Sequence, residues 1–219
     1  MSLESIRRDR DPDPRNRDLV FTRELPTADE TLEYQVARSS AGQVPGRGDP
    51  AVQIRALSIT QPWATLIAIG QKRVETRSWG TSYRGPIAIH AAKTFPGGAR
   101  DLCVPGPGFA RSPLYDALRA AGIRGPIRDR RRCSTGDLPL GAVLAIAELV
   151  DVRRITSPEA LGHVLGANEV AFGAWTPGRY AWLLAYVRPL AEPIPARGAQ
   201  GLWRWAPPAD LAFASRSPA

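Results

Sequence analysis

Hydrophobic and polar positions begin to follow a regular pattern near residue 53. In QIRALSIT, residues 53 to 60, Ile54 and Ala56 alternate with polar side chains, which predicts a short β-strand. The fifty residues before it mix charged residues with prolines and glycines and offer few apolar periods. We therefore expect residues 1–50 to form a disordered or loosely packed extension.

A short helix is expected directly after this strand. Pro62 suits the first turn of a helix, because a proline lacks the backbone N–H that would be unpaired there. Thr60 or Gln61 precedes it as the N-terminal cap, and apolar residues as far as Ile67 recur at helical spacing. Gly70 is expected to end this helix.

Several strand-like segments separated by turns, with few helices, predict a mixed α/β fold. We expect a small β-barrel with flanking short helices, spanning residues 51–206, and a flexible tail at 207–219. Residues 96–137 are rich in glycine, proline and arginine and are interpreted as an insertion, with the five arginines between Arg124 and Arg132 on a mobile basic loop. Further strands are expected at 73–79, 86–93, 140–155, 180–190 and 201–205, and short helices at 112–121 and 157–165.

The positive charge of the chain belongs to the part that is expected to fold. The whole sequence carries a net charge of +8, but its first fifty residues hold eight basic and ten acidic side chains. The excess of arginine and lysine therefore lies after residue 50. Such an excess favours a polyanionic partner, most simply nucleic acid, although an arginine-rich surface without such a partner is the alternative.

Other classes of protein are less compatible with the composition. The sequence has no run of about eighteen apolar residues, and its N-terminus lacks the apolar centre of a signal peptide, so we expect no membrane association and a cytoplasmic location. Cys103 and Cys133 have no cysteine or histidine at metal-ligand spacing and are expected to be reduced thiols. No metal and no cofactor are expected.

The two lysines of the chain lie within one short window, from Gly70 to Lys93. All other basic positions are arginine, which is a permanently charged fork, whereas burial can lower the pKa of a lysine. Lys72 and Lys93 therefore indicate a site. In the strand that follows Lys72, Glu75 and Arg77 share one face, and together they would form a polar cluster able to hold a base edge or a phosphate. An ordinary surface ion pair is the alternative.

Aromatic side chains flank this polar cluster. Trp79 and Tyr83 lie in a polar stretch and are candidates for stacking on nucleic-acid bases, whereas Trp182 lies in an apolar run and belongs to the core. His90 is interpreted as a structural residue. Lys93 leaves its strand beside His90 and is a candidate for a phosphate contact.

The segment SITQPWATLIAIGQKRVETRSWGTSYRGPIAIHAAK resembles the beginning of the ASCH domain, and FGAWTPGRYAWLLAYVRPLAEPIPARGAQGLWRW resembles its end. The most specific element is the helix followed by Gly-x-Lys-x-x-Glu-x-Arg. The resemblance implies a barrel related to PUA domains, which bind RNA. Our first hypothesis is a module that binds nucleic acid, RNA above all, or a modified nucleobase. Its ligand-binding residues would be Lys72, Glu75, Arg77, Trp79, Tyr83 and Lys93.

The resemblance also implies alternatives, because some small bacterial ASCH proteins remove the acyl group from N4-acylated cytidine and others are ribonucleases. In the amidohydrolase pattern a threonine stands three residues after the lysine, where this chain has Glu75, and Glu148 or Glu169 would have to supply a more distant glutamate. Glu75 favours a charged amine and so opposes the use of Lys72 as a base or nucleophile. Lys72 and Glu75 are the catalytic candidates if the protein is a hydrolase. A third alternative is an interaction module in transcription or translation.

Overall fold

The structure is a computed structural model that describes residues 53–106, 110–129, 132–156, 167–211 and 213. The extension at 1–50 and the helix expected at 157–165 lie outside the described residues. The strands are β1 (Ile54–Ile59), β2 (Val74–Arg77), β3 (Gly85–Ala91), β4 (Ile127–Asp129), β5 (Arg132–Ser134), β6 (Ala142–Arg154), β7 (Tyr180–Pro195) and β8 (Leu202–Trp205), and the helices are α2 (Trp63–Ala68), α3 (Gly97–Asp101), α4 (Pro113–Ala120) and α5 (Ala167–Ala171).

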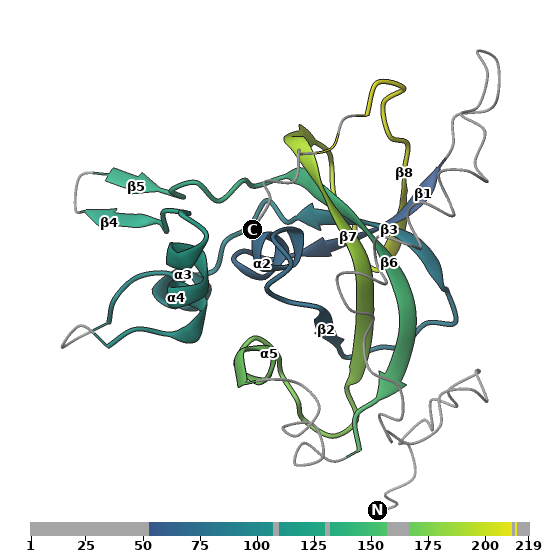
Figure 1. Cartoon of the computed structure of the whole chain (residues 1–219), viewed down its shortest axis with the longest axis horizontal. Helices are drawn as coiled ribbons and strands as arrows, with labels where there is room; N and C mark the ends of the chain where they lie inside the picture. Colours follow the sequence, from purple (N-terminus) through teal and green to yellow (C-terminus); the bar gives the residue numbers. More distant parts are fainter. Residues whose placement is uncertain (1–52, 107–109, 130–131, 157–166, 212, 214–219) are drawn as a thin grey trace, which may run out of the picture.

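Six strands form one mixed sheet in the order β2-β7-β6-β3-β1-β8. Only β1 and β3 run parallel, and the other pairs are antiparallel. The long strands β6 and β7 bend as they cross the molecule, which gives the sheet its curvature (Figure 1). The predicted mixed α/β class is confirmed. Within the described ranges no strand ladder joins the two edges, β2 and β8, but the Arg77 guanidinium donates to the Ser58 carbonyl of β1 at 2.5 Å.

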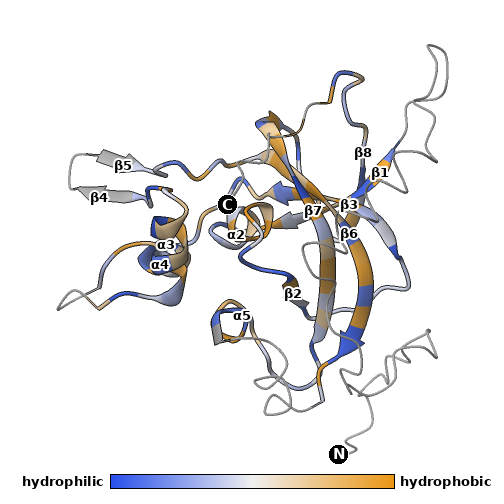
Figure 2. Cartoon of the chain, viewed as in Figure 1, coloured by the Kyte–Doolittle hydropathy of each residue, from blue (hydrophilic) through white to orange (hydrophobic). Residues whose placement is uncertain are grey.

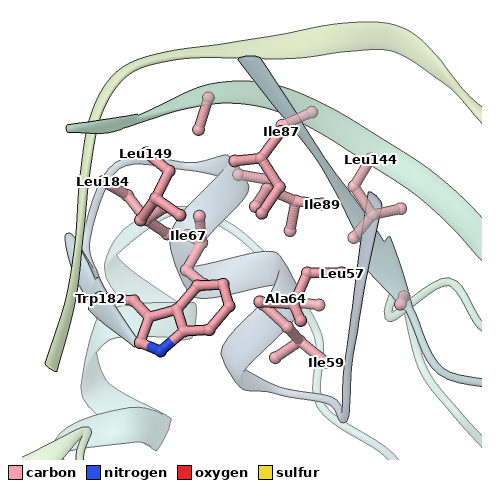
Figure 3. Close-up of a cluster of buried hydrophobic side chains, with 14 of the residues drawn as sticks. Leu57, Ile59, Ala64, Ile67, Ile87, Ile89, Leu144, Leu149, Trp182 and Leu184 are labelled. Carbon is pink, nitrogen blue, oxygen red and sulfur yellow. The ribbon is translucent and has the colours of Figure 1, made fainter. Parts of the chain in front are cut away.

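The main core lies on the inner face of this sheet, where α2 covers it. Leu57 of β1 and Ile87 and Ile89 of β3 are fully buried there, because alternate residues of a strand point to the same face. Figure 3 shows these side chains gathered around Ile67 of α2 and the indole of Trp182. Burial of each such aliphatic side chain stabilises the fold by about 1.5–3 kcal/mol. The prediction that Trp182 belongs to the core is confirmed.

The turn after α2 places the next residues beneath the helix. The Gln61 side chain accepts from the backbone N–H of Thr65 at 3.1 Å, but the N-terminal cap is Pro62, which follows both predicted caps, and the helix begins at Trp63. Gly70 has a φ of +77°, a conformation that suits glycine and ends the helix as expected. The backbone N–H of Lys72 then donates back to the Leu66 carbonyl at 3.0 Å. This tight return determines where the Lys72 side chain enters the protein.

The region predicted as an insertion forms a smaller lobe beside the sheet (Figure 1). The Ser112 hydroxyl caps α4 by accepting from the Tyr115 N–H at 3.0 Å, in agreement with the helix predicted at 112–121. The expectation of an irregular basic loop around Arg124–Arg132 is corrected in part, because β4 and β5 pair within the described residues of this segment as a two-stranded ribbon. Backbone pairing gives this segment a regular structure that its charge pattern alone does not reveal.

Two smaller observations concern the membrane and the chain end. In the ranges that the structure describes, no helix is both long enough and apolar enough to cross a membrane.

Within the tail for which we predict flexibility, Phe213 forms a bridge with Leu190, and the Arg188 guanidinium lies 3.6 Å from the centre of the Phe213 ring. At least this residue of the tail therefore contacts the sheet.

Candidate functional site

The polar residues of the lysine motif lie where the turn after α2, strand β2 and helix α5 meet. A hydrophilic segment leads from α2 into β2 (Figure 2), and α5 lies close to it in Figure 1. The strand and the helix are about a hundred residues apart in the sequence, so tertiary structure alone brings them together. Backbone and side-chain hydrogen bonds between them fix this arrangement.

Lys72 is fully buried, which is rare for a lysine. Its amine donates to the Val74 carbonyl and, at 3.1 Å, to the Phe172 carbonyl. Two carboxylates lie just beyond hydrogen-bond distance, with Glu75 Oε2 at 3.8 Å and Glu169 Oε1 at 3.9 Å from the nitrogen. The amine therefore occupies a closed cage of two carbonyl oxygens and two carboxylates.

Glu169 is the residue that joins α5 to β2. Its two carboxylate oxygens accept from the backbone N–H groups of Arg73 and Val74, both at 2.9 Å. From the sequence alone, Glu169 is one of two candidates for the more distant glutamate of the amidohydrolase pattern. The other, Glu148, lies on β6 opposite Pro86. Nothing local in the sequence distinguishes the two, because the distinction depends on how α5 packs against β2.

Opposing effects act on the Lys72 amine. Burial lowers its pKa from the ordinary value of 10.5, while the negative charges of Glu75 and Glu169 raise it again in part. Burial has the larger effect, so the pKa of Lys72 is lowered overall. As expected from the sequence, Glu75 opposes a lowered pKa of Lys72. Desolvation nevertheless outweighs the two carboxylates.

Arg77 extends the cluster toward the surface. Its Nε lies 3.5 Å from Glu75 Oε1, and its side chain is 25% exposed, whereas that of Lys72 is 0% exposed. The Nε atom is buried and has no hydrogen-bond partner among the residues that the structure describes. Arg77 is thus the cation of the cluster that reaches solvent, and its buried Nε faces the Glu75 carboxylate.

Trp79 and Tyr83 are both partly buried and anchored by the fold. The Trp79 ring packs edge-on against Trp182, with ring centres 4.7 Å apart, and the Trp79 carbonyl accepts from the Trp182 indole N–H at 3.2 Å. The Tyr83 hydroxyl donates to the Pro86 carbonyl at 2.6 Å. Both residues therefore contact the protein, and only part of each ring is accessible to a ligand.

His90 and Lys93 belong to a second constellation. His90 is buried, with Nδ1 3.0 Å from the Ser58 hydroxyl and Nε2 3.1 Å from the Ala196 carbonyl. The Trp203 indole N–H donates to the same hydroxyl at 3.2 Å, and the Trp203 ring packs edge-on against His90. Both nitrogens of His90 are thereby engaged in the fold. Lys93 is exposed and lines a cavity of about 720 Å³ beside His90.

The structure thus divides the predicted site residues into two groups. Lys72, Glu75 and Arg77 come together, and Glu169 joins them. The cavity that Lys93 lines has none of these four among its lining residues. In the described part of the chain, no group of three or more histidine, cysteine, aspartate or glutamate side chains is arranged to hold a metal ion.

The burial of His90 leads to a prediction on pH. Desolvation lowers the pKa of His90 below its ordinary value of 6.5, and the hydrogen bond with the Ala196 carbonyl opposes this change only in part. As the pH falls below about 6.5, the unfolded chain takes up this proton before the folded protein does, so the folded protein loses stability. We expect the free energy of unfolding in urea to fall between pH 7.5 and pH 5.5, and to fall less in His90→Gln.

The matched control for this pH series is His163→Gln, which removes the other histidine of the chain. In His163→Gln the free energy of unfolding is expected to fall with decreasing pH more steeply than it does in His90→Gln. Parallel curves for wild type and His90→Gln would contradict the assignment to His90.

Comparisons with known proteins agree with this structure. The family model of the ASCH domain matches residues 57–194. Activating signal cointegrator 1 of Homo sapiens is 35% identical over 97 residues, and its Mus musculus counterpart is 34% identical over 95 residues. In both cases the match covers 43% of this chain but only 14% of the length of the relative. Since the family model covers more than half of the sequence, the chain belongs to the ASCH domain family.

Proposed function

We propose that this chain is an RNA-binding ASCH module whose ligand contacts the surface beside the Lys72 cluster. The observation that carries the proposal is Arg77, a partly exposed guanidinium that Glu75 holds in an ion pair at 3.5 Å, two residues before Trp79, whose side chain is partly buried. An arginine beside an aromatic ring suits a phosphate and an unstacked base. The excess of basic residues after position 50 supports a polyanionic ligand.

In this proposal Lys72 acts as a positioning residue. Its amine has no exposed surface, so it holds Glu75 and the backbone of β2 in place, and Arg77 contacts the ligand. An arginine at position 72 would be too large for the closed cage, and such overpacking is destabilising. For this reason tolerance of Lys72→Arg does not separate a binding module from an enzyme, and the test has to use Arg77.

Binding of a labelled single-stranded RNA is expected to weaken as salt is raised, as measured by fluorescence anisotropy over a salt series. Arg77→Gln is expected to weaken it about tenfold, which corresponds to about 1.4 kcal/mol. The matched control is Arg119→Gln, which removes one exposed arginine of α4. Equal effects of the two variants, with both shown to be folded by thermal unfolding, would contradict a specific role for Arg77.

A hydrolase is the second candidate, and one observation favours it. Lys72 has a lowered pKa and lies between Glu75 and Glu169, a set of groups that can take up and release a proton. The closed cage opposes this candidate, because the amine already donates to two carbonyls and a substrate would have to displace them. Incubation with N4-acetylcytidine followed by mass analysis tests it, and turnover by wild type that persists in Arg77→Gln would favour the hydrolase.

A further inference from the structure

A preformed cavity lies beside the loop that joins β7 to β8, on the opposite face of β1 and β3 from the main core. Its volume of about 720 Å³ falls in the range of about 300–1,000 Å³ that is common for small-molecule sites. Ser58 and His90 line its floor, and they alternate along their strands with the inward-facing Leu57 and Ile89. The cavity therefore has a lining of its own, and it adjoins the Lys72 cluster at Ser58, whose backbone carbonyl accepts from Arg77.

Hydrogen bonds fix the loop that forms one wall of this cavity. The Ala199 carbonyl lies 3.1 Å from the Ser58 hydroxyl, and the Ala196 carbonyl lies 3.1 Å from His90 Nε2. The Ala196 N–H donates to the Gly141 carbonyl at 2.9 Å. At Gly198 a side chain would overlap His90 and Ser58, so the loop lies directly on this pair. The wall exists before any ligand arrives, which lowers the entropic cost of binding.

The charged groups of the cavity are of one sign. Lys93 and Arg197 line it, both are exposed, and no carboxylate residue lines it. Across the described ranges no aspartate or glutamate forms an ion pair with either of them. A lysine and an arginine together suit a phosphate group, the lysine as a point charge and the arginine as a fork of donors.

The uncharged residues that line the cavity suit the part of a ligand that is not a phosphate. Leu140, Ala92 and Pro195 supply apolar walls, and Gln200 adds an amide with both donor and acceptor groups. A sugar and a base fit such a lining better than a bare phosphate does, because a bare phosphate would leave the apolar walls without contact.

We propose that this cavity binds a nucleotide that bears a terminal phosphate, with the phosphate on Lys93 and Arg197 and the nucleoside against the apolar walls. The source is either a free nucleoside monophosphate or the phosphorylated end of an RNA chain. The RNA source deepens the proposed function and rests on it, whereas the free nucleotide does not.

The experiment uses the full chain and two probes. Adenosine 5′-monophosphate is titrated by calorimetry, and one short single-stranded RNA is compared with a phosphate at its 5′ end, at its 3′ end or at neither. Binding of the monophosphate, or a preference of at least tenfold for one phosphorylated RNA, is expected. Lys93→Gln combined with Arg197→Gln is expected to abolish it. Ala199→Phe, which fills the cavity without changing its charge, is expected to do the same, and Arg204→Gln, an exposed arginine outside the cavity, is expected to preserve it.

The outcomes separate this inference from the proposed function. RNA binding without any preference for a terminal phosphate, together with no binding of the monophosphate, would overturn the cavity proposal and leave RNA binding through Arg77 intact. Binding of the monophosphate without RNA binding would support the cavity and overturn the proposed function. A phosphate preference that survives Ala199→Phe and the double variant would also overturn the cavity proposal, because the preference would then arise elsewhere.

Discussion

Replacing Lys72 with methionine is expected to lower the free energy of unfolding by about 3–5 kcal/mol. The methionine keeps most of the side-chain volume but leaves the buried Glu75 and Glu169 without the cation that both of them face. The Val74 and Phe172 carbonyls also lose their donor. The loss comes mainly from these uncompensated groups, and urea unfolding monitored by circular dichroism measures it.

The other lysine of the chain provides a matched control. Lys93→Met makes the same chemical change at an exposed position and is expected to alter stability by no more than about 0.5 kcal/mol. Combining Lys72→Met with Glu169→Gln is expected to cost less than the sum of the single changes, because the second removes one of the charges that the first leaves unpaired. A loss below about 1 kcal/mol in Lys72→Met would mean that the cage does not hold a charged amine.

Replacing Glu169 with alanine is expected to cost about 3 kcal/mol. The backbone N–H groups of Arg73 and Val74 both donate to its carboxylate, and hydrogen bonds to a charged group contribute about 1.5–3 kcal/mol each. Glu169→Gln is expected to cost about half as much, because an amide offers one oxygen where the carboxylate offers two. Amide hydrogen exchange at Val74 provides a local measurement, and exchange is expected to be faster in both variants.

Glu192→Ala is the control for this pair, since Glu192 is exposed on β7. It is expected to change neither stability nor exchange at Val74. Unchanged exchange at Val74 in Glu169→Ala would show that α5 does not hold the start of β2 in solution, even if global stability falls.

Much of the fold follows from local patterns in the sequence. The alternation at Ile54 and Ala56 predicts β1, and Gly70 marks the end of α2 because a positive φ favours glycine. The six strands of the main sheet overlap the predicted segments. Their order in the sheet does not follow from these patterns, because the pairing of β2 with β7 depends on contacts between residues far apart in the chain.

The site shows the same limit more clearly. Spacing along β2 predicts that Glu75 and Arg77 lie side by side, and they do. The depth of Lys72 is not predictable from spacing, because its burial depends on Phe172 and Glu169, which come from α5 and the residue after it. Likewise, the position of Lys93 in a cavity depends on the loop at 195–200, which no pattern near Lys93 indicates.

The pairing of β2 with β7 affects how the chain folds during its synthesis. Among the residues that the structure describes, β2 pairs with β7 alone, more than a hundred residues later, and Lys72 and Glu169 join segments almost as far apart. During synthesis, residues 72–77 can therefore reach their folded arrangement only after most of the domain has left the ribosome. A chain that stops before β7 would leave β2 without this partner and would expose Val74, which is fully buried in the complete fold. We therefore expect such fragments to be recognised by chaperones and proteases rather than to bind a ligand.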